Sequence, residues 1–175
     1  MKLLRHGPRG AEKPGLLAAD GTIRDLTGLV PDISGAVLSD TGLAMLRAVD
    51  PASLPIVDPA TRLGPCVAGT GKFICIGLNY SDHAAETGAK VPPEPIIFMK
   101  ATSAICGPND PIVIPRGSVK TDWEVELAVI IGKTANLTAM EVGSGTAAIM
   151  DCARACCDSE QTLAHCGKCL VRRHG

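Results

Sequence analysis

The residues best suited to chemistry gather in three short groups between residues 79 and 127. Asn79-Tyr80-Ser81-Asp82-His83-Ala84-Ala85-Glu86 contains an imidazole and a carboxylate three positions apart. Phe98-Met99-Lys100 follows, and Asp122-Trp123-Glu124-Val125-Glu126-Leu127 places two acids two positions apart. These residue types provide candidates for a general base, a substrate-binding cation and a metal site.

The first group is expected to lie on a short helix that is capped near Ser81 and stopped by Gly88. Residues three apart share one face of a helix, so the Glu86 carboxylate can orient the His83 imidazole and stabilise its protonated form. Such a pair can take a proton from water. The competing interpretation is a solvated surface helix on which the two residues are unrelated.

The second group ends a predicted strand, Ile96 to Met99, at Lys100. An ammonium group in this place can hold a substrate carboxylate or a developing enolate oxygen. A lysine at the end of a strand also commonly just reaches solvent. The proline-rich stretch Val91 to Pro95 precedes this strand, and it would let the segment from Ser81 to Pro95 close over a substrate as a lid.

The third group opens the strongest predicted strand, Trp123 to Ile131. The side-chain period of two places Glu124 and Glu126 on one face of this strand. Ala128 and Ile130 continue that face, so the carboxylates are expected where the strand enters the core. A hard divalent ion, Mg2+, Mn2+ or Ca2+, would offset their repulsion and desolvation. The alternative is the ordinary solvent-facing end of a strand.

The order and separation of these groups, Y-x-x-H-x-x-E, F-x-K and E-x-E, resemble the fumarylacetoacetate hydrolase family from about Lys72 to Thr134. The opening, Lys2 to Arg5 and Lys13 to Leu17, is similar to the small N-terminal domain of bacterial members assigned as ureidoglycolate lyase. Members cleave or rearrange small oxo acids, including acylpyruvates, ureidoglycolate and dienoate dicarboxylates, with one divalent metal that chelates the substrate.

This resemblance implies a role for each group. Glu124 and Glu126 would be metal ligands, His83 with Glu86 the water-activating pair, and Lys100 a substrate contact. The implied function is a divalent-metal-dependent hydrolase or lyase that cleaves a C–C or C–N bond of a small oxo or hydroxy acid. Mg2+ or Mn2+ is the expected cofactor, with Ca2+ also suitable, and a complete domain is expected to form a homodimer.

The predicted fold is α+β and mostly β: an incomplete mixed β-sandwich roll of the fumarylacetoacetate hydrolase type, preceded by a small α/β N-terminal module. We place the module at 1–50, a Pro-rich linker at 51–66, a partial catalytic domain at 67–134 and an unassigned Cys-rich tail at 135–175. The linker follows from four prolines within fifteen residues, which exclude a helix or a central strand.

The elements of the N-terminal module can be read from local signals. We expect strands at Lys2–Arg5, Gly15–Ala18 and Thr22–Leu26, with Asp20-Gly21 as a hairpin turn. A helix capped by Ser39 or Asp40 should run to about Val49. In the catalytic part, a buried strand is expected at Phe73–Leu78 and another at Ile112–Ile114.

The tail has a different composition from the rest of the chain. No Pro and no aromatic residue occurs from Asn136 onward, and the family pattern, which would supply a third carboxylate ligand, is not visible after Ala135. Neither Asp151 nor Asp158 has the surroundings to replace it. We hypothesise a shifted reading frame or a truncated gene product, with an unfinished sheet, an under-coordinated metal and poor catalysis.

Two alternatives compete with the enzyme. One is a non-catalytic fragment that folds only against a complete partner subunit. The other is a structural zinc or redox site in the tail, for which Cys166-Gly167-Lys168-Cys169 has the favourable two-residue spacing. Its candidate ligands are Cys152, Cys156, Cys157, His165, Cys166, Cys169 and His174.

The composition narrows the partners. A formal net charge of -1 without a basic stripe argues against nucleic acid or an anionic membrane, so a small molecule is the expected partner. The first residues reach Gly7 and Pro8 before an apolar segment forms, which is not a signal peptide. Apolar runs such as Leu127 to Ile131 are too short to span a bilayer. A cytoplasmic protein is therefore predicted.

Overall fold

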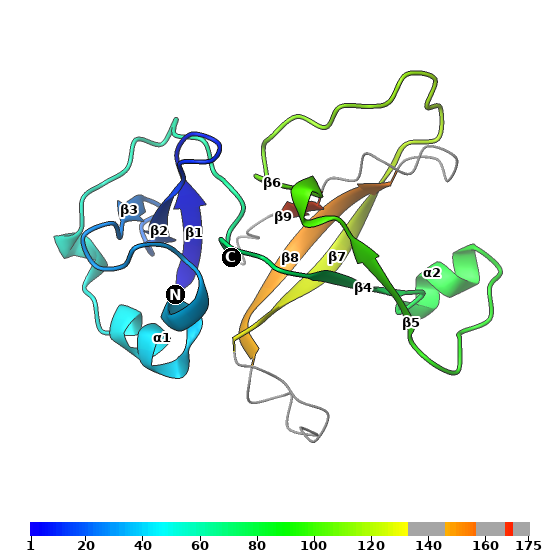
Figure 1. Cartoon of the computed structure of the whole chain (residues 1–175), viewed down its shortest axis with the longest axis horizontal. Coiled ribbons are helices and arrows are strands. Elements are labelled where there is room, and N and C mark those ends of the chain that lie inside the picture. The colour runs from blue at the N-terminus through cyan, green and yellow to red at the C-terminus, as the bar shows by residue number, and fades with distance from the viewer. Residues whose placement is uncertain (133–145, 157–166, 170–175) are drawn as a thin grey trace. The chain divides into compact units, whose positions relative to one another are not determined.

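The computed structural model describes residues 1–132, 146–156 and 167–169, with backbone alone for 122–125 and for the two later segments. Strands outnumber helices in these residues (Figure 1). The fold is therefore α+β and mostly β, as predicted. The described residues form two compact units: the first contains 1–69 and the described residues from 105 onward, and the second contains Thr70–Ala104.

The first unit begins with a three-stranded antiparallel sheet of β1 (Lys2–His6), β2 (Lys13–Leu17) and β3 (Ile23–Asp25). The turn between β2 and β3 is the predicted hairpin. Gly21 has a φ of 82°, which a residue without a Cβ adopts at little cost, and the Asp20 side chain accepts a hydrogen bond from Thr22 N at 2.9 Å. All three strands predicted in this region are thereby confirmed.

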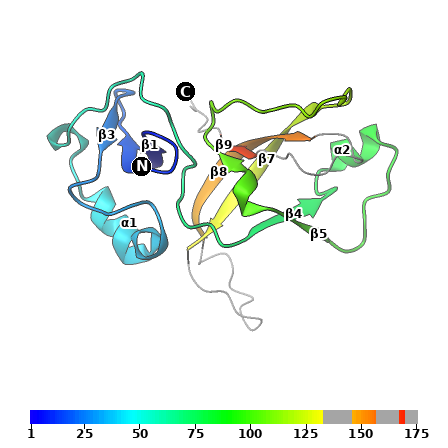
Figure 2. The same ribbon diagram turned by 45° about the horizontal axis from the view of Figure 1, so that its top comes forward.

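Helix α1 (Asp40–Arg47) lies on one side of this sheet (Figures 1 and 2). The Ser39 side chain accepts a hydrogen bond from Gly42 N, so the predicted cap is confirmed. Leu43 and Leu46 face inward and join the core of the unit. Its buried members are Leu16, Leu26, Val30, Ile33, Leu38, Leu43 and Leu46.

A network of charged side chains ties the β1–β2 hairpin to more distant segments. Arg5 binds both carboxylate oxygens of Asp32, at 2.7 and 3.0 Å. Arg62 binds both carboxylate oxygens of Asp110, at 2.7 and 2.6 Å, and donates to Glu12 at 2.9 Å. Two-pronged guanidinium–carboxylate pairs of this kind fix geometry as well as supplying energy. Thus the ion pairs of Arg62 with Asp110 and Glu12 fix the predicted linker at this residue.

The turn that carries Asp110 depends on a glycine. A Cβ added at Gly107 would collide with the backbone carbonyl of Leu63 and would lie 3.2 Å from the Asp110 carboxylate. Gly107→Ala should therefore lower the free energy of unfolding by about 1–3 kcal/mol. Urea denaturation measures this, with Gly28→Ala as the control, because nothing lies within 4 Å of a Cβ at Gly28. Equal stability of the two variants would contradict the close approach.

The second unit is built on β4 (Phe73–Gly77) and β5 (Ile96–Lys100), which pair antiparallel in a two-stranded sheet. Helix α2 (Ser81–Glu86) lies in the connection between them. The two strands and the helix match the sequence predictions. However, Ile74 and Ile76 are 56% and 41% exposed, so the prediction of a buried strand at Phe73–Leu78, which is β4, is wrong. A sheet of two strands cannot bury its own side chains, because burial requires further strands or a helix packed against it.

The remaining strands belong to the first unit and form a four-stranded sheet in the order β6-β9-β8-β7. These are β6 (Ile105–Cys106), β7 (Asp122–Ile131), β8 (Thr146–Cys156) and β9 (Gly167–Cys169). β7 and β8 pair antiparallel over their whole length, as Figure 1 shows.

One expectation about this region is wrong. Ile112–Ile114 is not a strand, because Pro111 and Pro115 on either side lack the amide donors that a ladder needs. β8, which comes from the tail that we left unassigned, pairs with one edge of β7, and β7 remains the last strand of this sheet among the described residues. The tail therefore contributes backbone pairing that its composition did not indicate. In the described residues, no helix is long and apolar enough to cross a membrane.

Candidate functional site

The helix that carries His83 and Glu86 is set by turns at both of its ends. Leu78, directly after β4, has a φ of 50°, and this left-handed residue redirects the chain toward α2. At the other end, Gly88 has a φ of 67°, which fits the predicted stop. The Thr87 hydroxyl donates to the His83 carbonyl at 3.0 Å and closes the last turn. Local signals in the sequence thus define this helix.

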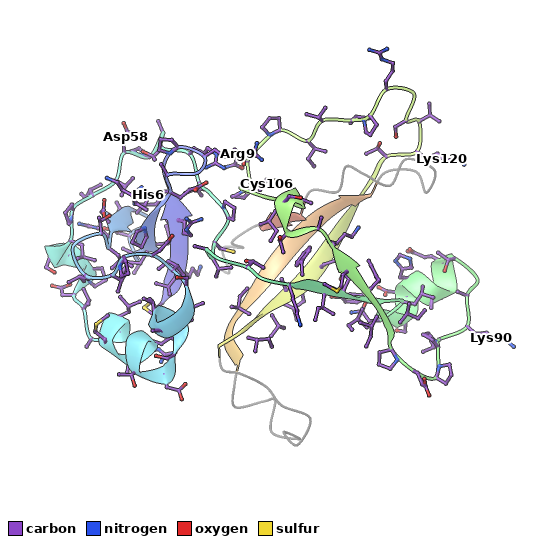
Figure 3. All side chains as sticks on the ribbon, viewed as in Figure 1. His6, Arg9, Asp58, Lys90, Cys106 and Lys120 are labelled. Atoms are coloured by element: carbon purple, nitrogen blue, oxygen red, sulfur yellow. The ribbon has the colours of Figure 1, made fainter. Side chains whose placement is uncertain are left out.

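His83 and Glu86 both lie on α2, and both side chains are exposed. No hydrogen bond or ion pair joins these two side chains in the part of the chain that the structure describes. Their shared helical face follows from the spacing, while the contact between carboxylate and imidazole is not made in this conformation. Figure 3 shows Lys90 extending outward from the loop after this helix.

Lys100 is the last residue of β5 and lies opposite Phe73 in the sheet register. Its ammonium lies 5.7 Å from the centroid of the Phe98 ring, a cation–π contact that holds the side chain over the strand. The residue is half-buried. This placement differs from that of a lysine extended into solvent, the competing interpretation of the sequence.

The acids of the third group lie on β7, as predicted. Glu126 is half-buried, whereas Leu127, Val129 and Ile131 on the alternate face are 52%, 47% and 56% exposed. Ile130, on the same side as Glu126, packs against the core of the first unit. The side that carries Glu126 is therefore the more protected side of the strand. The Glu124 side chain lies outside the described residues.

The donor atoms of these residues can be compared with those that a divalent metal ion prefers. Carboxylates that share one side of a strand offer the oxygen donors that hard divalent cations prefer. Among the side chains that the structure describes, in residues 1–121 and 126–132, no group of three or more His, Cys, Asp or Glu could hold such an ion. The donor chemistry fits, and the donor set remains incomplete in the described part of the chain.

The five predicted residues divide between the two units. His83, Glu86 and Lys100 belong to the second unit, and Glu124 and Glu126 belong to the first. Most ligands of the alternative zinc site lie outside the described residues. For Cys152, Cys156 and Cys169 the backbone alone is described, with Cys152 opposite Cys169 between β8 and β9.

The sequence did not point to a buried histidine at the end of β1. His6 is 4% exposed, and its Nε2 atom lies 3.9 Å from Asp25 without a hydrogen-bond partner. Gly15 makes room for this pair, because a Cβ there would lie 2.9 Å from the His6 ring. Burial opposes ionisation of Asp25, yet hydrogen bonds from Thr27 and the Coulombic interaction with His6 hold the pKa of Asp25 below its usual value. Figure 3 labels His6 in this module.

Among the described residues, the carboxylate with the most strongly shifted pKa is also remote in sequence from the predicted site. Hydrogen bonds from the Arg62 guanidinium lower the pKa of Asp110 to about 2. Glu12 is desolvated by burial, yet the hydrogen bond from Arg62 keeps its pKa below the usual value. Because these acids are fully paired with guanidinium groups, the network is suited to structure rather than to proton transfer. No motif around Arg62 indicated it.

An apolar groove lies on the face of the β1–β2–β3 sheet opposite the core. The lining that the structure describes comes from residues 4 to 63 and includes Leu4, Leu17, Ile23, Ile56 and Leu63. It contains no titratable side chain among these described residues. The groove is therefore not a candidate for the chemistry predicted from the sequence.

Comparison with known proteins defines the class of the chain. The family model "Fumarylacetoacetate (FAA) hydrolase C-terminal" matches residues 72–168, more than half of the chain. The chain belongs to the fumarylacetoacetate hydrolase family. The match contains all five predicted site residues, and it continues past Thr134, where the sequence motifs end.

Individual relatives support the same assignment. A provisionally named hydrolase of Burkholderia lata is 69% identical over 134 residues, which are 77% of this chain and 48% of the relative. A fumarylacetoacetate hydrolase of Exiguobacterium antarcticum is 27% identical, with a TM-score of 0.60 over 89% of this chain and 56% of that one. The chain spans about half the length of the curated relatives it matches.

A further solved structure shares the fold alone. This is a 5-carboxymethyl-2-hydroxymuconate delta-isomerase of Mycobacterium smegmatis, 24% identical, with a TM-score of 0.61 over 92% of this chain and 57% of that one.

Proposed function

We propose that this chain carries part of the active site of a divalent-metal-dependent hydrolase or lyase that acts on a small oxo or hydroxy acid. The bond cleaved is C–C or C–N, as in acylpyruvates or ureidoglycolate. The observation that carries the proposal is the family match across residues 72–168, which contains the His83, Lys100 and Glu126 groups in order. The relative from Burkholderia lata, named as a hydrolase, supports the reaction class.

Each residue has a proposed role. Glu124 and Glu126 hold a Mg2+ or Mn2+ ion, for which the protected side of β7 supplies oxygen donors. A bound ion of this type supplies Lewis acidity at the substrate oxygen. His83 takes a proton from water and Glu86 orients the imidazole, which requires the two exposed side chains to come into contact when substrate binds.

Lys100 is proposed to bind the substrate carboxylate. Lys100 is half-buried and its ammonium lies over the Phe98 ring, an environment with less competing water than a fully solvated lysine has. We also propose the finer architecture: an incomplete mixed β-sandwich roll after a small α/β N-terminal module, with homodimer formation by the complete domain. The antiparallel β7–β8 pairing is compatible with such a roll.

Metal binding tests the proposal without depending on turnover. Calorimetric titration of the chain with Mn2+ should give one site, and Glu126→Gln or Glu124→Gln should weaken it by about 100-fold or more, since even outer contacts of metal sites are worth 10-fold to 100-fold. Glu94→Gln is the matched control, because Glu94 is an exposed loop acid. Unchanged Mn2+ affinity in both β7 variants would refute the metal site.

Activity is a second readout. The chain, beside a full-length relative, should be assayed with oxaloacetate, acylpyruvates and ureidoglycolate in the presence and absence of Mg2+ or Mn2+. Divalent-dependent cleavage that is lost in His83→Ala but retained in Glu94→Gln supports the enzyme. Mn2+ binding without cleavage of any of these acids favours the non-catalytic alternative.

A further inference from the structure

The side of β7 that carries Glu126 makes a contact with the core of the first unit. Glu126, Ala128 and Ile130 share this side, because successive side chains of a strand point to opposite sides, and all three are half-buried. The side chains between them are exposed: Leu127, Val129 and Ile131. Ile130 packs against the hydrophobic core whose buried members lie between residues 16 and 46. The strand that carries the proposed metal ligands is therefore anchored in the N-terminal module.

β7 needs an anchor of this kind to hold a metal ion. It is the last strand of its sheet among the described residues and pairs there with β8 on one edge. The twist between neighbouring strands ranges over about 25°, and a rotation of that size moves a carboxylate about 5 Å from the strand axis by roughly 2 Å. Metal–oxygen distances tolerate only about 0.2 Å. Backbone pairing on one edge is thus not enough to fix the ligands.

The ladder is irregular at the anchor itself. Ile130 lies opposite Ala148, whereas the next residue, Ile131, lies opposite Thr146, so β8 has one residue more than β7 at this point. A bulge of this kind raises the local twist and changes the direction of nearby side chains. The contact that Ile130 makes beside the bulge therefore determines how the ligand side of β7 is turned.

We infer that Ile130 is a positioning residue for the metal ligands of β7. Its contact with the module core fixes the twist of the strand, so that the carboxylates of Glu124 and Glu126 can hold one ion. Ile130 lies four residues from Glu126, about 13 Å along the strand, so it acts through the backbone and not by touching the ion. The inference rests on the proposed function, because the ion is the one assigned to that site.

The Ile130 contact also contributes to stability, and two controls separate this contribution from positioning. Val67 is half-buried and packs against the same core, but it lies outside β7. Its truncation loosens the core without altering the strand. Val129 is the neighbour of Ile130 on β7 and is 47% exposed on the other side. Its truncation alters the strand on the side that does not carry the ligands.

Calorimetric titration of the full 175-residue chain with Mn2+ tests the inference, under conditions in which urea denaturation shows every variant folded. We expect Ile130→Ala to bind Mn2+ at least about fivefold more weakly, within the range of coupling through packed side chains. Ile130→Val keeps the branch at Cβ and should bind within about twofold of the wild type. Val67→Ala should lower the urea midpoint as Ile130→Ala does and keep wild-type affinity, and Val129→Ala should keep both.

Wild-type affinity in Ile130→Ala overturns the inference. An equal loss of affinity in Val67→Ala also overturns it, since general loosening of the core would then be the cause. If Ile130→Ala does not fold, Ile130→Leu decides, because it keeps the volume but moves the branch, and about threefold weaker binding is expected; wild-type affinity there has the same meaning. A wild-type chain without a Mn2+ site refutes the proposed function together with this inference, whereas a site that depends on Glu126 but not on Ile130 refutes the inference alone.

Discussion

Replacing Arg62 with methionine is expected to lower the free energy of unfolding by about 2–4 kcal/mol. The variant leaves Asp110 and Glu12 without their main cation, while their side chains are only 13% and 7% exposed. Removal of one member of a fully buried ion pair costs about 3–5 kcal/mol. We place the expected loss somewhat lower, because Arg62 itself is 25% exposed.

The matched control is Arg47→Met, since Arg47 is exposed at the end of α1. Its effect should stay within about 0.5 kcal/mol. Urea denaturation followed by circular dichroism measures both variants. If Arg62→Met and Arg47→Met have the same midpoint, the network does not hold the first unit together.

The same ion pair predicts a dependence on pH. Arg62 lowers the pKa of Asp110 from 3.8 to about 2, so the carboxylate contributes stability that is fully present above the unfolded value. This contribution is lost as the pH falls through about 2. The difference in stability between the wild type and Arg62→Met should therefore shrink between pH 4 and pH 2, and a constant difference would contradict the assignment.

Truncation of Leu46 to alanine is expected to cost about 3–5 kcal/mol. Leu46 is 1% exposed and belongs to the core that joins α1 to the first sheet. The substitution removes buried methyl groups and leaves a cavity, and this combination gives losses of about 2–5 kcal/mol in protein cores. Helix propensity does not contribute to the loss, because alanine is the best helix former.

Met45→Ala is the control for this prediction, because the Met45 side chain, next to Leu46 on α1, is 46% exposed. A loss below about 1 kcal/mol is expected there. Both variants are measured by urea denaturation, and the slope with denaturant must stay unchanged for the comparison to report stability. A Leu46→Ala variant as stable as Met45→Ala would mean that α1 does not pack on the sheet.

Local chemistry explains why much of the fold could be predicted. The Asp20-Gly21 turn and the Ser39 cap are satisfied by atoms within three residues, so the sequence window contains the whole interaction. The strand β7 has a ten-residue apolar and acidic pattern with a clear period. The local sequence therefore carries much of the information for elements of this kind.

Long-range contacts explain what could not be predicted. Arg62 and Asp110 are 48 positions apart, and the sequence around either residue gives no signal that predicts the pair. The exposure of Ile74 depends on how many strands the sheet has, which a strand pattern does not encode. Likewise, β8 consists largely of small residues, so its pairing with β7 is a property of the assembled backbone.

The candidate site was predictable in its residue types more than in its geometry. The alternation of Glu124 and Glu126 follows from the strand period alone. The position of Lys100 at the end of β5 follows from the apolar run before it. Whether the His83 imidazole meets Glu86 depends on side-chain rotamers at an exposed surface, and no sequence pattern fixes these.

The connection from Leu78 to Pro95 leaves and rejoins the sheet at one rung, because Gly77 and Ile96 are paired. The entropy of closing such a segment rises slowly with its length, by about 0.6 kcal/mol per doubling. The loop between α2 and β5 can therefore change in length while β4 and β5 keep their pairing register. We expect differences in ligand preference among homologues to arise in this loop, with little change in the two flanking strands.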